Sequence, residues 1–247
     1  MKLHTLLLVS FCAAATSFAE TAKNLAIDPK PRDAGWMKRH EGFNAISKKG
    51  EAQLVFLGDS ITAGWEKNGK DVWARTWAPY KAANFGIGGD RTEHVIWRLQ
   101  HGNFDGIKPK LVVLMIGTNN TGHQGRPAPE HGGVAYASSA EQTAEGVKMI
   151  LDVLGKKLPE TKVLLQGIFP RGATKDDDKR KQNIATNNLI SGFADNKRVF
   201  YMDIGNSFLK PDGTLPKEIM PDLLHLSAQG YQMWADAIEG KVKELMK

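Results

Sequence analysis

Three residues in two short segments have the types and the order needed for nucleophilic catalysis. The apolar run 53–57 is followed by Gly58-Asp59-Ser60, and Asp222-Leu-Leu-His225 lies shortly before the C-terminal end. In a parallel sheet, an apolar strand that ends in a small residue and a hydroxyl places that hydroxyl at the carboxyl edge. Serine reacts at neutral pH only when a base accepts its proton and an acid orients the base. The pattern predicts a serine hydrolase with Ser60 as nucleophile, His225 as base and Asp222 as orienting acid.

Each of these residues also has a structural alternative. Ser60 suits the N-cap of a helix, which is compatible with catalysis because a helix N-terminus favours negative charge. Asp222 suits the cap of a helix that begins near Ser227, and His225 is one of seven histidines. The Asp-x-x-His spacing favours the catalytic interpretation over these alternatives.

Two further blocks follow predicted strands, namely Gly86-Ile-Gly-Gly-Asp90 and Gly117-Thr-Asn-Asn120. The first resembles a dinucleotide-binding fingerprint only superficially, because it lacks the final glycine of Gly-x-Gly-x-x-Gly and follows the second strand. No cofactor is therefore expected. No metal site is expected either, because the spacing of four further histidines does not suit shared ligation. These are His94, His101, His123 and His131.

The elements expected to position these blocks alternate between strands and helices. Apolar or β-rich runs predict five strands, at 53–58, 82–86, 111–116, 162–168 and 198–203. Helical periodicity predicts helices at 32–49, 91–101, 140–156, 179–194 and 226–245. This alternation predicts an α/β fold, a three-layer α/β/α sandwich around a mainly parallel five-stranded sheet. The long loop 121–139 is expected to form a binding rim.

The first residues have the pattern of a secretory signal peptide. Met1-Lys2 precedes an apolar stretch that reaches Ala15, and Ser17-Phe18-Ala19 places small residues before a cleavage site. The apolar stretch is too short for a membrane anchor. We expect a secreted or periplasmic protein whose signal peptide is removed after Ala19.

This boundary divides the chain into a signal peptide at 1–19, a flexible lead-in at 20–31 and one hydrolase domain at 32–247. The single cysteine, Cys12, would leave with the signal peptide. Disulfides, a cysteine nucleophile and thiolate metal sites are therefore excluded from the mature protein.

The charge pattern bears on the binding partner. The 247 residues are 41% hydrophobic, enough for one sizeable core, and have a formal net charge of +6. The positive residues are interleaved with acids, as at 175–181, which is typical of a solvated surface. We therefore expect no nucleic-acid partner. No amphipathic lipid-docking helix is evident, so no stable membrane insertion is expected.

Taken in order, the blocks at 58–60, 86–90, 117–120 and 222–225 resemble those of the GDSL-type esterases, also called SGNH hydrolases. The closer resemblance is to the catalytic subunits of brain-type platelet-activating-factor acetylhydrolase, and it extends from about Val55 to the final helix. The third block ends in Asn where the wider family usually has Asp, a feature that those subunits share.

This resemblance implies a flavodoxin-like SGNH hydrolase fold and a homodimer. It also assigns the donors of an oxyanion hole to the backbone N–H groups of Ser60 and Gly89 and to the side-chain amide of Asn119. Such donors stabilise the tetrahedral intermediate of acyl transfer. Glycine suits this role because no Cβ stands between its N–H and the substrate.

The function expected is hydrolysis of short-chain carboxylic esters, in particular acetyl esters. Ile61, Thr118 and Leu224 adjoin the catalytic residues and are expected to wall the acyl pocket. The alcohol moiety stays open between an O-acetylated carbohydrate and a short-acyl phospholipid. The alternative is a catalytically silent glycan-binding module on the same fold, and the presence of every catalytic residue type counts against it.

Overall fold

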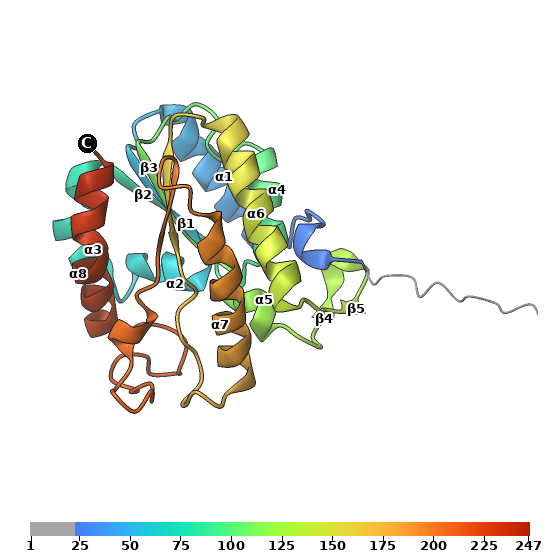
Figure 1. Ribbon diagram of the computed structural model, residues 1–247. Helices are drawn as coiled ribbons and strands as arrows, with labels where there is room; N and C mark the ends of the chain where they lie inside the picture. Colours follow the sequence, from blue (N-terminus) through green and yellow to red (C-terminus); the bar gives the residue numbers. More distant parts are fainter. Residues whose placement is uncertain (1–22) are drawn as a thin grey trace, which may run out of the picture.

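A five-stranded parallel sheet lies at the centre of the molecule (Figure 1). The computed structural model describes residues 23–247, and the strand order is β2-β1-β3-β6-β7. The strands are β1 Leu54–Gly58, β2 Ala82–Gly86, β3 Leu111–Met115, β6 Lys162–Gln166 and β7 Val199–Met202. Every pairing in this sheet is parallel, so the predicted α/β fold is confirmed. The strand order reverses at β1, where ligands of such sheets bind outside the carboxyl ends.

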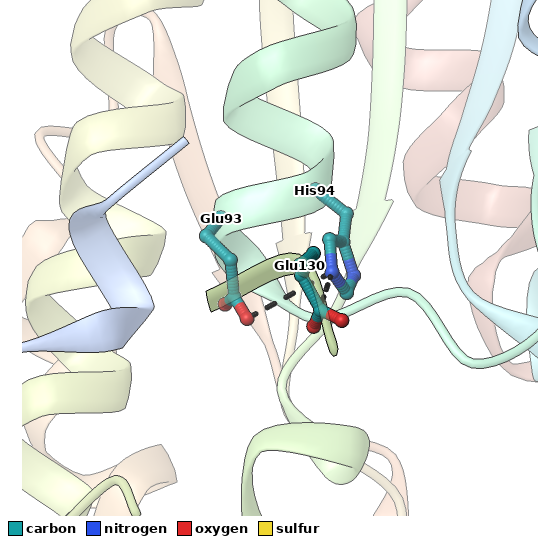
Figure 2. Close-up of side chains that lie close together, drawn as sticks. All are labelled: Glu93, His94 and Glu130. Carbon is teal, nitrogen blue, oxygen red and sulfur yellow. Dashed lines mark hydrogen bonds and ion pairs between the residues drawn. The ribbon is translucent and has the colours of Figure 1, made fainter. Parts of the chain in front are cut away.

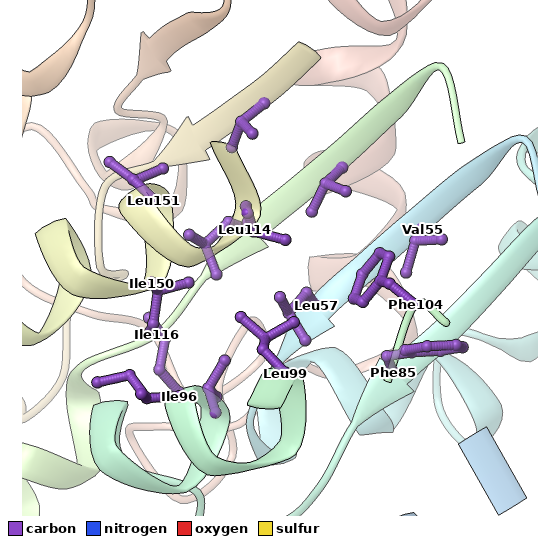
Figure 3. Close-up of a cluster of buried hydrophobic side chains, with 14 of the residues drawn as sticks. Val55, Leu57, Phe85, Ile96, Leu99, Phe104, Leu114, Ile116, Ile150 and Leu151 are labelled. Atoms are coloured by element: carbon purple, nitrogen blue, oxygen red, sulfur yellow. The ribbon is translucent and has the colours of Figure 1, made fainter. Parts of the chain in front are cut away.

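The strands send alternate side chains into two separate cores. Val55 and Leu57 of β1 lie in one core, which Figure 3 shows between the sheet and the helices, and Leu54 and Phe56 lie in the other. Successive side chains of a strand point to opposite faces of the sheet. Because both faces are covered, all five residues of β1 are buried, and the strand reads as a continuous apolar run.

Helices pack on both faces of the sheet (Figure 1). The first core receives apolar side chains from α1 Ala34–Lys49, α4 Thr92–Gln100, α6 Ala140–Lys157 and α7 Asp178–Ile190. The second receives them from α3 Lys70–Thr76 and α8 Ala228–Leu245. All five predicted helices are confirmed, and their ends differ from the prediction by a few residues. The helix α3 was not predicted. The N-termini of α1, α6, α7 and α8 are capped by side chains, which are those of Asp33, Ser139, Asp177 and Ser227 respectively.

The remaining helical elements are short and were not predicted as separate elements, although Ser191–Phe193 falls within the helix expected at 179–194. They are α2 Ser60–Ala63, α5 Thr118–Gly122 and the 3-10 turns Leu25–Ile27, Gly64–Glu66, Ala78–Tyr80, Pro129–His131, Ser191–Phe193 and Gly205–Phe208. Segments this short do not contain enough turns for an apolar periodicity to emerge. Both α2 and α5 directly follow a central strand and therefore lie at the carboxyl edge of the sheet.

Two segments expected to be irregular are packed and partly regular. Within the loop 121–139, β4 Pro127–Ala128 pairs antiparallel with β5 Val134–Ala135. Leu25 is buried against Ala128 and Tyr136 of this hairpin segment, and Thr92 Oγ1 donates a hydrogen bond of 2.8 Å to Ala26 O. The expectation of a flexible lead-in is therefore wrong for residues 24–27, because Leu25 packs against the hairpin segment and Ala26 is bonded to α4.

The predicted signal peptide at 1–19, including Cys12, lies outside the described residues. Within residues 23–247, no helix combines the length and the apolar character that crossing a membrane requires.

Candidate active site

The structure brings Ser60, His225 and Asp222 into one hydrogen-bonded chain. Ser60 Oγ lies 2.8 Å from His225 Nε2, and His225 Nδ1 lies 2.6 Å from Asp222 Oδ2. With Nδ1 donating to the carboxylate, Nε2 is left as the acceptor for the Ser60 hydroxyl. Burial alone would raise the pKa of Asp222, but hydrogen bonds from the His225 side chain and backbone lower it overall. The acid is therefore ionised at neutral pH and orients the imidazole for proton transfer.

The structure does not assign Ser60 and Asp222 the helix-capping roles that were their alternatives. The residue that caps α2 is Asp59, whose side chain accepts from Ile61 N, and Ser60 is the first helical residue. The residue that caps α8 is Ser227. Asp222 instead accepts hydrogen bonds from the backbone N–H of His225, at 2.7 Å, and from its side chain. These contacts fix the Asp222 carboxylate on the imidazole.

The residues assigned to the oxyanion hole line the same cavity as the Ser-His pair. Ser60, Gly89, Asn119 and His225 all lie on this cavity of about 300 Å³, hereafter the active-site cavity. Gly89 has a φ of +78°, a conformation that favours glycine, and a Cβ there would lie 3.1 Å from an Arg32 nitrogen. The expected donors thus come from the ends of β1, β2 and β3, which are neighbours in the sheet.

The structure distinguishes the two asparagines of the third block. Asn119 lies on the active-site cavity, and its Nδ2 donates to Asp90 O at 2.9 Å, which leaves its second N–H available. Asn120 is fully buried, and its Nδ2 donates to Thr92 Oγ1 and to Tyr136 OH. The position of Asn119 therefore fits an oxyanion donor. Asn120 instead links α5 to α4 and to the loop 121–139.

The acyl pocket needs correcting. Leu224 lines the active-site cavity, but Ile61 and Thr118 are not among its lining residues. Ile61 is 1% exposed and packs in the second core, since one step along a helix turns a side chain by about 100° away from Ser60. Thr118 is fully buried, and Arg171 Nη1 donates to its hydroxyl and to its carbonyl. Of the three predicted walls, only Leu224 reaches the cavity surface.

Besides Gly122, sequence reasoning missed three side chains that line the cavity, those of His123, Arg126 and Arg171. Arg171 follows β6, and the other two lie within the loop 121–139, which was expected to form a rim. Burial, together with the nearby arginines, lowers the pKa of His123 to about 4, so its ring is neutral at neutral pH. The cavity therefore carries two guanidinium groups, for which no motif in the sequence gave a signal.

Asp59 is a second residue that sequence reasoning did not assign. It is fully buried directly before Ser60, and its Oδ2 has no hydrogen-bond partner among the described residues. Burial raises the pKa of Asp59 to about 7, and the negative charge of Asp90 contributes. This acid therefore titrates near neutral pH within one residue of the nucleophile.

A buried ion pair holds the second block in place. Arg98 Nη2 lies 2.9 Å from Asp90 Oδ2, and both side chains are fully buried. Arg98 also donates to Phe85 O at 2.9 Å and to Gly58 O at 3.3 Å. The Asp90 carboxylate accepts a further bond from Trp36 Nε1, at 2.6 Å. These contacts tie the loop that carries Gly89 to the carboxyl ends of β1 and β2.

Figure 2 shows Glu93, His94 and Glu130, the one group in residues 23–247 whose ligand atoms converge as a metal site requires. Arg91 forms ion pairs with both carboxylates. Its backbone N–H also donates to His94 Nδ1 at 3.0 Å, so in the neutral ring Nε2 carries the proton. That nitrogen faces Glu130 at 3.4 Å and has no lone pair to offer a cation. We interpret the group as an ion-pair network around Arg91.

Comparisons with known proteins agree with this arrangement. A sequence profile of the GDSL-like Lipase/Acylhydrolase family matches residues 56–233. The chain is 35% identical over 215 residues to platelet-activating factor acetylhydrolase IB subunit alpha1 of Bos taurus, covering 87% of this chain and 85% of that protein. Among solved structures, a GDSL-like lipase from Bacteroides thetaiotaomicron has a TM-score of 0.66 at 19% identity, covering 84% and 97% of the two chains. An acetylxylan esterase from Geobacillus stearothermophilus has a TM-score of 0.61 at 18% identity, covering 80% and 96%.

Proposed function

Because the chain belongs to the GDSL-like lipase/acylhydrolase family and is a carboxylic-ester hydrolase, we propose that Ser60, His225 and Asp222 are its catalytic triad. The observation that carries this proposal is the hydrogen-bonded chain from Ser60 Oγ through His225 to Asp222, which opens on the cavity that Gly89 and Asn119 also line. The family and the complete set of catalytic residue types argue against a catalytically silent glycan-binding module.

The geometry supports acyl transfer in two steps. Ser60 Oγ attacks the ester carbonyl while His225 Nε2 accepts its proton, and the N–H groups of Ser60, Gly89 and Asn119 stabilise the oxyanion. His225 then protonates the departing alkoxide, which leaves as the alcohol and gives an acyl-Ser60 ester. A water molecule, deprotonated by His225, attacks this ester and releases the carboxylic acid and free Ser60.

The proposed substrate is a short-acyl ester, in particular an acetyl ester. The active-site cavity is about 300 Å³, at the low end for ligand pockets, and Leu224 is the one aliphatic side chain among its described lining residues. The relative from Bos taurus is named an acetylhydrolase, and one structural neighbour is an acetylxylan esterase. These names support acetyl removal from a phospholipid or from a carbohydrate. The leader-like pattern at 1–19 supports action outside the cytoplasm.

Hydrolysis of 4-nitrophenyl acetate by the wild-type protein and by two variants tests the triad. We expect Ser60→Ala and His225→Ala each to lower kcat by roughly 10³-fold or more, because the residues act as a unit. Circular dichroism checks that both variants fold. Near-wild-type activity in a folded Ser60→Ala variant would rule out the proposed nucleophile.

A further inference from the structure

Apart from the catalytic Ser60 and His225, the active-site cavity offers a ligand mainly hydrogen-bond donors and positive charge. Arg126 and Arg171 both line it beside Ser60. The arginines that form ion pairs within residues 23–247 are Arg32, Arg39, Arg91 and Arg98. Arg126 and Arg171 form no ion pair within 4.0 Å in that range, and the carboxylates that act on Arg171, those of Asp177, Asp59 and Asp222, do so from beyond this distance.

Arg171 is held in place by contacts that leave part of its guanidinium unused. Its Nη1 donates to Thr118 O at 2.7 Å and to Thr118 Oγ1 at 3.1 Å. Its Nε and Nη2 have no hydrogen-bond partner among the described residues. Gly122 makes room for the group, since a Cβ there would lie 2.6 Å from Nη1. Burial lowers the pKa of Arg171, but a guanidinium stays protonated at neutral pH.

The turn that carries Arg171 is itself fixed by a buried arginine. Arg180, only 2% exposed, donates from Nε to Arg171 O at 2.9 Å and from Nη2 to Gly172 O. These bonds fix the backbone of the turn, and the bonds to Thr118 fix the Arg171 side chain, so little freedom is lost when a ligand binds.

The turn that carries Arg171 lies next to the general base His225, and this position indicates which part of the substrate Arg171 contacts. Gly172 N donates to Leu223 O at 3.0 Å, so the turn is bonded to the segment that carries His225. The general base returns its proton to the departing alcohol, so the alcohol moiety lies on the His225 side. The carbonyl oxygen is directed toward the N–H groups of Gly89 and Asn119.

Arg126 and His123 extend the donor surface beyond this point. Both residues, with Gly89, also line an adjoining cavity of about 480 Å³. Arg91 Nη1 lies 3.1 Å from His123 Nδ1, which must accept because a guanidinium only donates. The remaining proton of the neutral His123 ring is therefore on Nε2, another donor. A ligand that satisfies this surface is rich in acceptors and negatively charged.

We propose that the ester substrate carries an anionic oxygen group, a carboxylate or a phosphate, on its alcohol moiety, and that Arg171 and Arg126 bind this group. The proposal rests on the proposed function and narrows its substrate class. Both an acidic O-acetylated carbohydrate and a short-acyl phospholipid contain such a group. A neutral acetylated sugar does not.

Matched substrates test the preference. 3-Acetoxybenzoate and 3-acetoxybenzamide differ in charge but not in the ester, and acetylglycerol phosphate against monoacetylglycerol gives the phosphate arm. We expect kcat/KM to favour the anionic member of at least one pair by about tenfold or more, and the pair that shows it identifies carboxylate or phosphate. Arg171→Gln and Arg126→Gln should each lower that ratio by about tenfold, while the control Arg75→Gln, exposed and outside the cavity, should not change it. Equal loss on charged and neutral substrates would assign Arg171 a purely structural role and overturn the proposal.

Binding to the Ser60→Ala variant separates this proposal from the proposed function. Calorimetry should show that this variant binds 3-acetoxybenzoate and acetylglycerol phosphate more tightly than their neutral partners, and that adding Arg171→Gln removes the difference. No charge preference in binding would refute the anion site even if hydrolysis is confirmed. A preference for phenyl hemisuccinate over phenyl butyrate, with none between the alcohol-side pairs, would place the charge on the acyl side and overturn the proposal as well.

Discussion

Asn119 and Asn120 are adjacent in the sequence but have different surroundings, which gives a residue-scale prediction. Asn119 reaches the active-site cavity, whereas the Asn120 amide is bonded to Thr92 and Tyr136. We expect Asn119→Ala to lower kcat about 10²-fold with little change in KM, because it removes a donor used mainly in the transition state. Asn120→Ala should instead lower the free energy of unfolding by about 1–3 kcal/mol, because buried groups lose their partner. Steady-state kinetics and urea denaturation of both variants check this, and the reverse pattern would contradict the assignment of Asn119.

Asp59 gives a prediction about stability and pH. Its pKa is raised from 3.8 to about 7 in the folded protein, so between these values the folded state holds a proton that the unfolded state has lost. The contribution of this group to stability is therefore complete below pH 3.8 and decreases as the pH rises through 7. Asp59→Asn keeps an oxygen for Ile61 N and cannot ionise. We expect this variant to be more stable than the wild type at pH 8, by on the order of a few kcal/mol, and little different at pH 4.

Urea denaturation at both pH values measures this effect, and Asp212→Asn, at a fully exposed carboxylate, is the control. If Asp59→Asn and the wild type lose stability in parallel between pH 4 and pH 8, Asp59 is not the group that titrates.

At the scale of elements, the sequence predicts what periodicity and burial determine. Strands β1, β3 and β6 were predictable because two covered faces make them largely apolar runs. The edge strands β2 and β7 were predictable because they alternate with helical segments, and α6 and α8 because they are long and amphipathic. The short helices α2 and α5 were not predictable, yet α2 is the reason Ile61 points away from the cavity. His123, Arg126 and Arg171 were not predictable as cavity residues, because only the order of the strands brings their loops together. No local spacing connects residue 171 with residue 60.

The contact between α4 and the ends of β1 and β2 gives an element-scale prediction. Arg98 on α4 forms a buried ion pair with Asp90 and donates hydrogen bonds to two strand carbonyls. Arg98→Met should lower the free energy of unfolding by about 3–5 kcal/mol, because Asp90 loses its closest counter-charge while buried. Arg98→Met combined with Asp90→Asn should recover part of this loss, since no unpaired charge remains. Urea denaturation measures both. A double variant no more stable than Arg98→Met would show that the charge pair is not the main contribution.

At the scale of the whole molecule, the site is built from both ends of the described chain. Ser60 follows the first strand, and His225 lies just before the last helix, so the Ser-His pair forms only when the sheet and α8 are both in place. All the residues that the proposed mechanism uses lie within the hydrolase domain at 32–247.

Removal of the segment 1–19 is the whole-chain prediction. Small residues at Ser17 and Ala19 follow the apolar stretch, so cleavage by an exporting host is expected after Ala19. The mature chain would begin at Glu20 and would contain no thiol, because Cys12 is the only cysteine. N-terminal sequencing of the exported protein should read Glu-Thr-Ala-Lys, and a thiol reagent should not label the protein after denaturation. A catalytically active protein recovered outside the cytoplasm that still contains Cys12 would contradict cleavage at this site. Accumulation of the full-length chain in the cytoplasm of its native host would contradict export itself.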